Sequence, residues 1–127
     1  MDVDRNDNAR VVDPDAIDQL RELRVDGEPD PLAELVDMYI ADTAQRIETI
    51  SAAIGDERHA DIERGAHALA GGSAVFGAES LIAVCRRLQM AGRTADLGAA
   101  RELIGRLEQE FERIRAALHA ELRNDGA

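Results

Sequence analysis

Residues 30–50 read DPLAELVDMYIADTAQRIETI, and this segment decides the fold class. Asp30 followed by Pro31 is a typical helix start, because an aspartate side chain accepts hydrogen bonds from free backbone N–H groups and proline tolerates the first helical position. Apolar residues then recur at helical spacing, and they are Leu32, Leu35, Val36, Tyr39, Ile40, Ile47 and Ile50. The segment therefore predicts a long amphipathic helix that ends near Ile54.

The same signals recur along the rest of the chain. Asp13-Pro14 starts a short helix, Gly55-Asp56 separates two helices, and Gly77 and the turn Gly92-Arg93-Thr94 mark later breaks. The predicted helices cover residues 14–24, 31–54, 56–76, 78–91 and 95–122. These elements predict an all-α fold, an antiparallel up-and-down four-helix bundle with the short extra N-terminal helix as a lid.

Composition is consistent with one helical domain. The chain has 127 residues, of which 45% are hydrophobic and 2% aromatic, so aliphatic side chains must build the core. We expect a disordered N-terminal tail over residues 1–12, the helical bundle over residues 13–123 and a C-terminal tail over residues 124–127.

Charge and cysteine content exclude several classes of protein. The formal net charge is -11 and the 15 basic residues are all arginine, which argues against a nucleic-acid binder. The first residues lack a signal-peptide pattern and no apolar run is long enough to span a membrane, so we expect a soluble cytoplasmic protein. Cys85 is the single cysteine; it excludes an internal disulfide and falls on a predicted core stripe, as an inert packing residue.

A second segment, AHALAGGSAVFGA at residues 66–78, holds a histidine among small residues. The core stripe of its helix is Ile62, Ala66, Leu69, Ser73 and Phe76. His67 lies about 140° from the centre of that stripe, so its imidazole should face outward. Its neighbours on the outer face are Ala60, Glu63, Ala70, Gly71 and Ala74. This surface allows either the docking of another protein close to the imidazole or the packing of the first helix or a second copy.

The sequence at this point resembles the histidine-containing phosphotransfer (HPt) domains of bacterial and plant phosphorelays. The resemblance rests on AHALAGGSAVFGAESL and on the stretch Val84-Cys85-Arg86-Arg87-Leu88. The family pattern is matched at His67, Leu69, Gly71, Ser73, Gly77, Ala78 and Leu81. The resemblance extends over about residues 14–122, nearly the whole chain.

The resemblance implies that His67 is the phospho-accepting residue. It also implies that Gln89 hydrogen-bonds the imidazole or the phosphoryl group. The family lysine three residues after the histidine is Ala70 here, and the chain has no lysine. Arg93 and Arg64 are the candidate substitutes for its charge.

The same resemblance implies a phosphocarrier rather than a true enzyme. Its partners would be response-regulator receiver domains, a hybrid histidine kinase, or both. The receiver would supply Mg²⁺, so no cofactor and no metal site is expected in this chain. We expect a free-standing monomer, since one exposed histidine per bundle suffices.

Three other interpretations remain in view. The first is a non-phosphorylated helical adaptor that binds receiver or kinase domains, which Ala70 favours. The second is a metal site at His59, Glu63 and His67; it is disfavoured because a helix turns by about 80° over eight residues and the three side chains diverge. The third is a nucleophilic hydrolase, which Cys85 in the core does not support.

Overall fold

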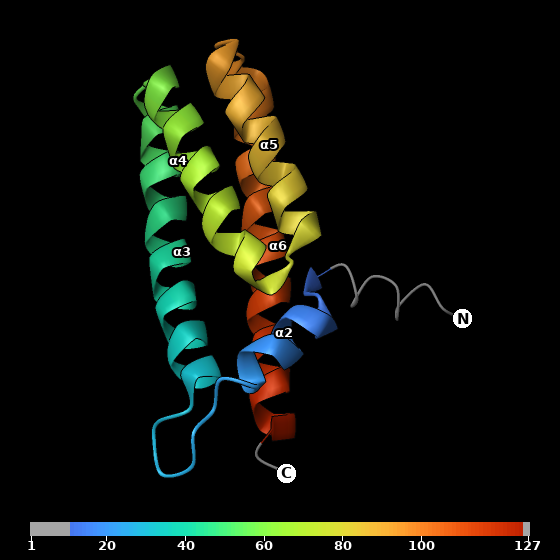
Figure 1. Ribbon diagram of the computed structural model, residues 1–127. Helices are drawn as coiled ribbons and strands as arrows, with labels where there is room; N and C mark the ends of the chain where they lie inside the picture. Colours follow the sequence, from blue (N-terminus) through green and yellow to red (C-terminus); the bar gives the residue numbers. More distant parts are fainter. Residues whose placement is uncertain (1–10, 126–127) are drawn as a thin grey trace, which may run out of the picture.

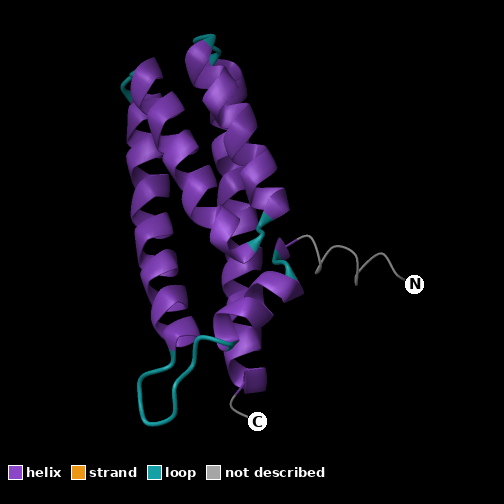
Figure 2. Ribbon diagram, viewed as in Figure 1, coloured by secondary structure: helices purple, strands orange, loops and turns teal. Residues whose placement is uncertain are grey.

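The computed structural model describes the backbone of residues 11–125 and the side chains of residues 11–123. The predicted disordered tail therefore lies mostly outside the described residues. The helices are α2 (Pro14–Arg21), α3 (Pro31–Gly55), α4 (His59–Ser73), α5 (Glu79–Arg93) and α6 (Leu97–Asp125), with a short 3-10 turn, η1 (Ala74–Phe76), after α4. No strand occurs in the described part of the chain (Figure 2). The prediction of an all-α fold is confirmed.

The four long helices alternate in direction along the bundle (Figure 1). Each contacts the next in sequence, and α6 also contacts α3, which closes the ring. Asp30 caps α3 by accepting a hydrogen bond from the backbone N–H of Leu32 at 3.0 Å, and Asp13 caps α2 in the same way through Asp15. The predicted up-and-down bundle with a short N-terminal helix is therefore present, and aspartate-proline pairs start two of its helices.

Unequal helix lengths explain the place of α2. Helices α4 and α5 have 15 residues each, whereas α3 has 25 and α6 has 29. At 1.5 Å per residue, α4 and α5 are therefore about 22 Å long and leave part of the longer pair uncovered. Helix α2 covers that part, where Ile17 is fully buried and Arg21 donates to the backbone oxygen of Glu121 on α6 at 2.9 Å.

The core is aliphatic, as the composition indicates. Its largest fully buried side chains are Phe76, Ile17, Leu32, Ile50, Ile62, Leu69, Leu81, Leu88, Leu107, Ile114, Leu118 and Val36. Val11 and Val12 also belong to it, each 4% exposed, so placing them in the tail was wrong. The backbone N–H of Asp13 donates to the carbonyl oxygen of Phe76 at 2.9 Å, which holds this end of the chain against η1.

Several helix boundaries differ from the prediction. Helix α2 ends at Arg21 instead of residue 24, and α4 begins at His59 instead of residue 56. The second difference arises because Glu57 has a φ of 58°, a left-handed conformation that a helix cannot contain. The continuous helix predicted over 56–76 ends at Ser73 and tightens into η1 before Gly77, whose φ is 60°.

The end of α5 and the ends of α6 also differ. Gly92 and Arg93 were predicted to form a turn but continue α5. Helix α6 begins at Leu97, after Ala95 takes a φ of 56°, and extends to Asp125. The predicted C-terminal tail of residues 124–127 is therefore partly helical, with residues 126–127 outside the described residues.

A pair of hydroxyls is buried between α3 and α4. Tyr39 Oη lies 2.7 Å from Ser73 Oγ, and the Tyr39 ring meets Phe76 edge to face with 5.0 Å between ring centroids. Burial raises the pKa of the Tyr39 phenol. The contact joins the first half of α3 to the last residue of α4.

No helix in the described residues is long and apolar enough to cross a membrane.

Candidate functional site

His67 lies near the middle of α4, on the side turned away from the core. The residues of α4 that are buried are Ile62, Ala66, Leu69 and Ser73, which are the predicted core stripe. The imidazole is exposed. The predicted outward orientation of His67 is therefore confirmed.

A hollow of about 250 Å³ adjoins the imidazole between α4 and α5. One wall consists of His67, Ala70 and Gly71 of α4 with Ala74 of η1, and the other consists of Ile82, Arg86 and Gln89 of α5. No residue of α2 lines it. The small side chains on the α4 wall therefore leave an open surface beside the histidine instead of packing against the first helix.

Gln89 is the α5 residue in contact with the imidazole. Its side-chain Nε2 lies 3.5 Å from Nδ1 of His67, at the outer limit of a hydrogen bond. Rotation of the amide by half a turn would exchange its oxygen and nitrogen, so that Oε1 would accept a hydrogen bond from a protonated Nδ1. In that arrangement the lone pair is on Nε2, which has no hydrogen-bond partner among the described residues.

The close approach of α5 to α4 depends on Gly92. A Cβ atom at this position would lie 2.7 Å from the backbone nitrogen of Glu63 and 2.9 Å from the backbone oxygen of His59. Only glycine allows such a separation between two helix backbones. Gly92 lies three residues after Gln89, so it sets the distance across which Gln89 reaches His67.

The two arginines proposed as substitutes for the missing lysine both have carboxylate partners. Arg93 Nε donates to Oε2 of Glu63 at 2.9 Å, across the junction of α4 and α5. Arg64 donates to Asp61 at 2.7 Å, and neither arginine lines the hollow beside His67. Arg93 is therefore near the site but paired, and Arg64 is directed toward the start of α4.

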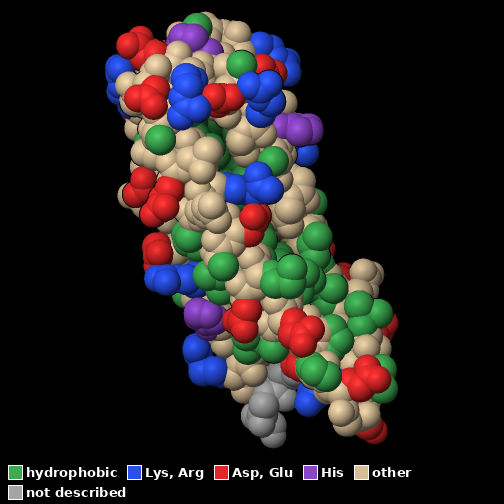
Figure 3. Space-filling view, turned by 90° about the vertical axis from the view of Figure 1, so that its left-hand side faces the viewer, with side chains coloured by type: hydrophobic (Ala, Val, Ile, Leu, Met, Phe, Trp, Pro, Cys, Tyr) green, Lys and Arg blue, Asp and Glu red, His purple; other side chains and the backbone are tan. Residues whose placement is uncertain are grey.

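The start of α4 is a small ionic cluster. Arg64 and Arg58 both donate to Asp61, each at 2.7 Å, and these two guanidinium groups lower the pKa of Asp61. Charged side chains of both signs gather at this end of the bundle, drawn at the top of Figure 3. The hollow beside His67 lies further along α4, next to small and apolar side chains.

The predicted docking surface is only partly assembled around the hollow. Ala70, Gly71 and Ala74 line it. Ala60 is exposed but lies about two helical turns before His67. Glu63 forms an ion pair with Arg93. A Cβ atom added to Gly71 or Gly72 would meet nothing within 4 Å. Packing within the described part of the chain therefore does not require either glycine.

Sequence reasoning missed two residues that line the hollow, Ile82 and Arg86. Both precede Gln89 on α5 at steps of seven and three, which places them on the same side of that helix. That spacing was available in the sequence. The signal needed in addition was that this side of α5 faces the outer side of α4.

Other candidate chemistry finds no support in the described residues. No group of three or more His, Cys, Asp or Glu side chains there is placed to hold a metal ion, and His59 and His67 do not form one with Glu63. Cys85 is fully buried, and this burial raises the pKa of its thiol to about 12. The prediction that Cys85 is a packing residue is confirmed.

Comparisons with known proteins agree with this architecture. The sequence matches the family model described as Hpt domain over residues 34–117, more than half of the chain. The fold is similar to the crystal structure of histidine-containing phosphotransfer protein B (HptB) from Pseudomonas aeruginosa PAO1, with a TM-score of 0.80 and 26% sequence identity over 90% of this chain and 96% of that chain.

A second similar structure is the histidine-containing phosphotransfer protein MtHPt2 from Medicago truncatula. The TM-score is 0.75 and the identity is 24%, with 92% of this chain and 84% of that chain covered; at that identity the likeness concerns the fold alone. Comparison with curated proteins gave no match.

Proposed function

We propose that His67 is the residue that carries the phosphoryl group. The premise is that the chain belongs to the Hpt domain family and has a role in histidine phosphotransfer in a phosphorelay. His67 would accept the group from the aspartate of a receiver domain and pass it to the aspartate of another. The observation that supports this assignment is the exposed imidazole beside an open hollow, with Nδ1 next to Gln89 and Nε2 free of partners in the described residues.

The chemical step uses the lone pair of Nε2. As the N–P bond forms, the P–O bond to the aspartate breaks and the carboxylate leaves with the electron pair. The proton on Nδ1 is retained there by Oε1 of Gln89 once the amide is rotated.

Phosphoryl transfer of this kind depends on in-line placement and charge stabilisation more than on covalent help. In our proposal the receiver domain brings the divalent cation, Mg²⁺, and this chain brings the nucleophile and a surface that allows close approach. The chain would then act as a monomeric phosphocarrier for receiver domains, a hybrid histidine kinase, or both. Gly71 and Ala74 fit this role because they place only a hydrogen atom and a methyl group beside the imidazole.

The first experiment is transfer from a phosphorylated receiver domain to the full chain and to two variants. We expect the native chain to gain an acid-labile, alkali-stable phosphate, and His67→Gln to fall to background. His119→Gln, which alters an exposed histidine of α6, is the matched control and should be labelled like the native chain.

Two outcomes would contradict the proposal. Phosphate retained by His67→Gln would place the acceptor elsewhere. Binding of receiver domains without any transfer to the native chain would favour the helical adaptor, the alternative that the absence of lysine at position 70 raises.

A further inference from the structure

A phosphoryl group on His67 needs positive charge beside it, and in this chain that charge must come from arginine. Such a group adds about -1.5 to -2 charges at neutral pH, and the chain already has a formal net charge of -11 and no lysine. Opposite charge beside the phosphoryl oxygens stabilises both the transfer and the product. The question is which arginine can reach those oxygens.

Among the described residues, Arg86 is the one arginine that lines the hollow beside His67. Arg93 and Arg64 are held by Glu63 and Asp61 respectively. Within residues 11–123, Arg86 has no ion-pair or hydrogen-bond partner. Glu79 lines the neighbouring hollow together with Arg86 but forms no ion pair with it there. Arg86 is therefore exposed beside the imidazole with its hydrogen-bond donors available.

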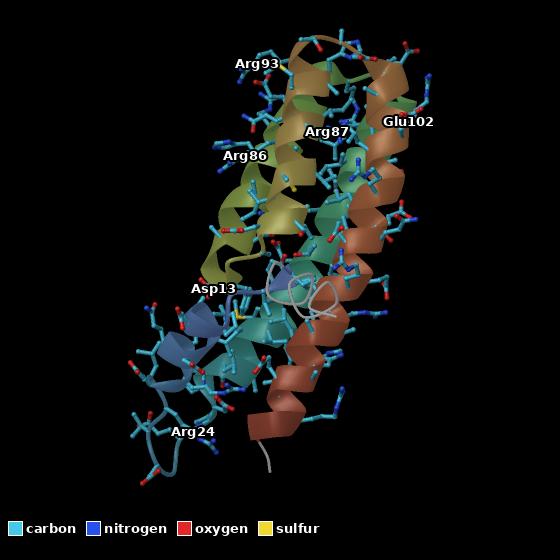
Figure 4. The ribbon with its side chains drawn as sticks, turned by 90° about the vertical axis from the view of Figure 1, so that its right-hand side faces the viewer. Asp13, Arg24, Arg86, Arg87, Arg93 and Glu102 are labelled. Atoms are coloured by element: carbon cyan, nitrogen blue, oxygen red, sulfur yellow. The ribbon has the colours of Figure 1, made fainter. Side chains whose placement is uncertain are left out.

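The geometry of α5 directs Arg86 toward the site. Arg86 and Gln89 are three residues apart, on the side of α5 that meets α4, and Gln89 contacts the imidazole. Figure 4 shows Arg86 and Arg93 extending from the same side of α5, whereas Arg87 lies toward α6. Beside His67 the opposite wall has only small residues, Ala70, Gly71 and Ala74, so space remains for a guanidinium group over the phosphoryl oxygens.

We propose that Arg86 binds the phosphoryl oxygens on His67 and supplies, from α5, the positive charge that α4 lacks at position 70. The inference rests on the proposed function of His67. The planar guanidinium can donate two parallel N–H hydrogen bonds to phosphoryl oxygens, which fixes the orientation of the group as well as neutralising it. Arg86 forms and breaks no covalent bond in the step.

The test uses a small phosphoryl donor, phosphoramidate, which removes receiver docking from the measurement. The phosphate on His67 is identified as the ³¹P signal that His67→Gln lacks. We expect Arg86→Gln to reduce the rate of His67 phosphorylation about tenfold, the effect of one lost charge-assisted hydrogen bond. Arg87→Gln is the matched control: it removes the same charge from the adjacent exposed position and should leave the rate within about twofold.

Relocation of the charge distinguishes binding from a structural role. Arg86→Lys should restore part of the rate, and Ala70→Lys in the Arg86→Gln background should restore it from the opposite wall. A further measurement is the pKa of the phosphoryl group on His67, followed by ³¹P NMR during a pH titration. Because a nearby positive charge favours the ionised form, this pKa should rise in Arg86→Gln and remain unchanged in Arg87→Gln.

The two proposals fail in different ways. If the native chain carries phosphate on His67 while Arg86→Gln has an unchanged rate and an unchanged phosphoryl pKa, the role of Arg86 is overturned and that of His67 stands. If the native chain takes no phosphate on His67 from either donor, both are overturned.

Discussion

Helices α4 and α6 both bury one side in the core, but their outer sides differ. Around Gly71 the outer side of α4 presents His67, and Ala74 follows in η1. The outer side of α6 presents charged pairs such as Arg113 with Glu110 at 3.0 Å, and exposed charges such as Glu102 near Gly105. A partner that covered α6 would have to remove water from those charges, which is costly, whereas the part of α4 around Gly71 has little to dehydrate except one imidazole.

This difference shows where the chain can be approached closely. Gly71 and Gly105 are a matched pair, because a Cβ atom added to either would meet nothing within 4 Å. Neither glycine is needed for packing among residues 11–123. If α4 is the docking surface, only a substitution at Gly71 should change the affinity for a partner.

The largest expected effect comes from a bulky charged side chain at each of these glycines. Gly71→Arg should weaken binding of a receiver domain on the order of 100-fold, because the side chain occupies the space beside His67. Gly105→Arg should change the affinity less than about twofold. Titration calorimetry with a receiver domain measures both, and equal losses in the two variants would remove the distinction between α4 and α6.

A smaller effect is expected at Gly92, which, unlike Gly71 and Gly105, has no space for a Cβ atom. Gly92→Ala should lower the free energy of unfolding by about 1–3 kcal/mol, since the added methyl group would press on the backbone of α4 at Glu63 and His59. Urea denaturation gives this value. An unchanged midpoint would mean that α4 and α5 separate without cost, and would weaken the argument that Gly92 sets the distance from Gln89 to His67.

The smallest expected effect is a gain in stability. Gly71→Ala and Gly105→Ala should each raise the free energy of unfolding by about 0.5–1 kcal/mol, because alanine loses less conformational entropy in a helix than glycine does. Thermal unfolding of the two variants checks this. A loss of stability in Gly71→Ala alone would reveal a packing role for this glycine and leave less reason to assign it to docking.

The fold class was predictable because hydrophobic spacing reports which side of each helix is buried. The stripes through Ile62 and Leu69 on α4, and through Leu81 and Leu88 on α5, are buried as predicted. Exact helix ends were not predictable in the same way. Glu57 and Ala95 take positive φ values without being glycine. Their residue types therefore do not predict the turns that they form.

The site was predictable in part, for a related reason. The orientation of His67 follows from the periodicity of a single helix. The exposure of Arg86 to the same hollow, and the burial of Gly92 against the backbone of Glu63, depend on how two helices face each other. Spacing within one helix carries no information about that arrangement, so Gly92 was assigned to a turn and Arg86 was overlooked.

The buried contact between Tyr39 and Ser73 has a consequence for register. In a bundle of Leu, Ile, Val and Ala, one helix could slide along another by a turn, about 5.4 Å, and exchange one set of aliphatic contacts for a similar set. A hydroxyl pair at 2.7 Å cannot slide in this way, because each buried oxygen would lose its partner at a cost of about 1–3 kcal/mol. Ser73 lies six residues after His67 on the same helix. This contact, which takes no part in the chemistry, therefore fixes the position of His67 along the axis of the bundle.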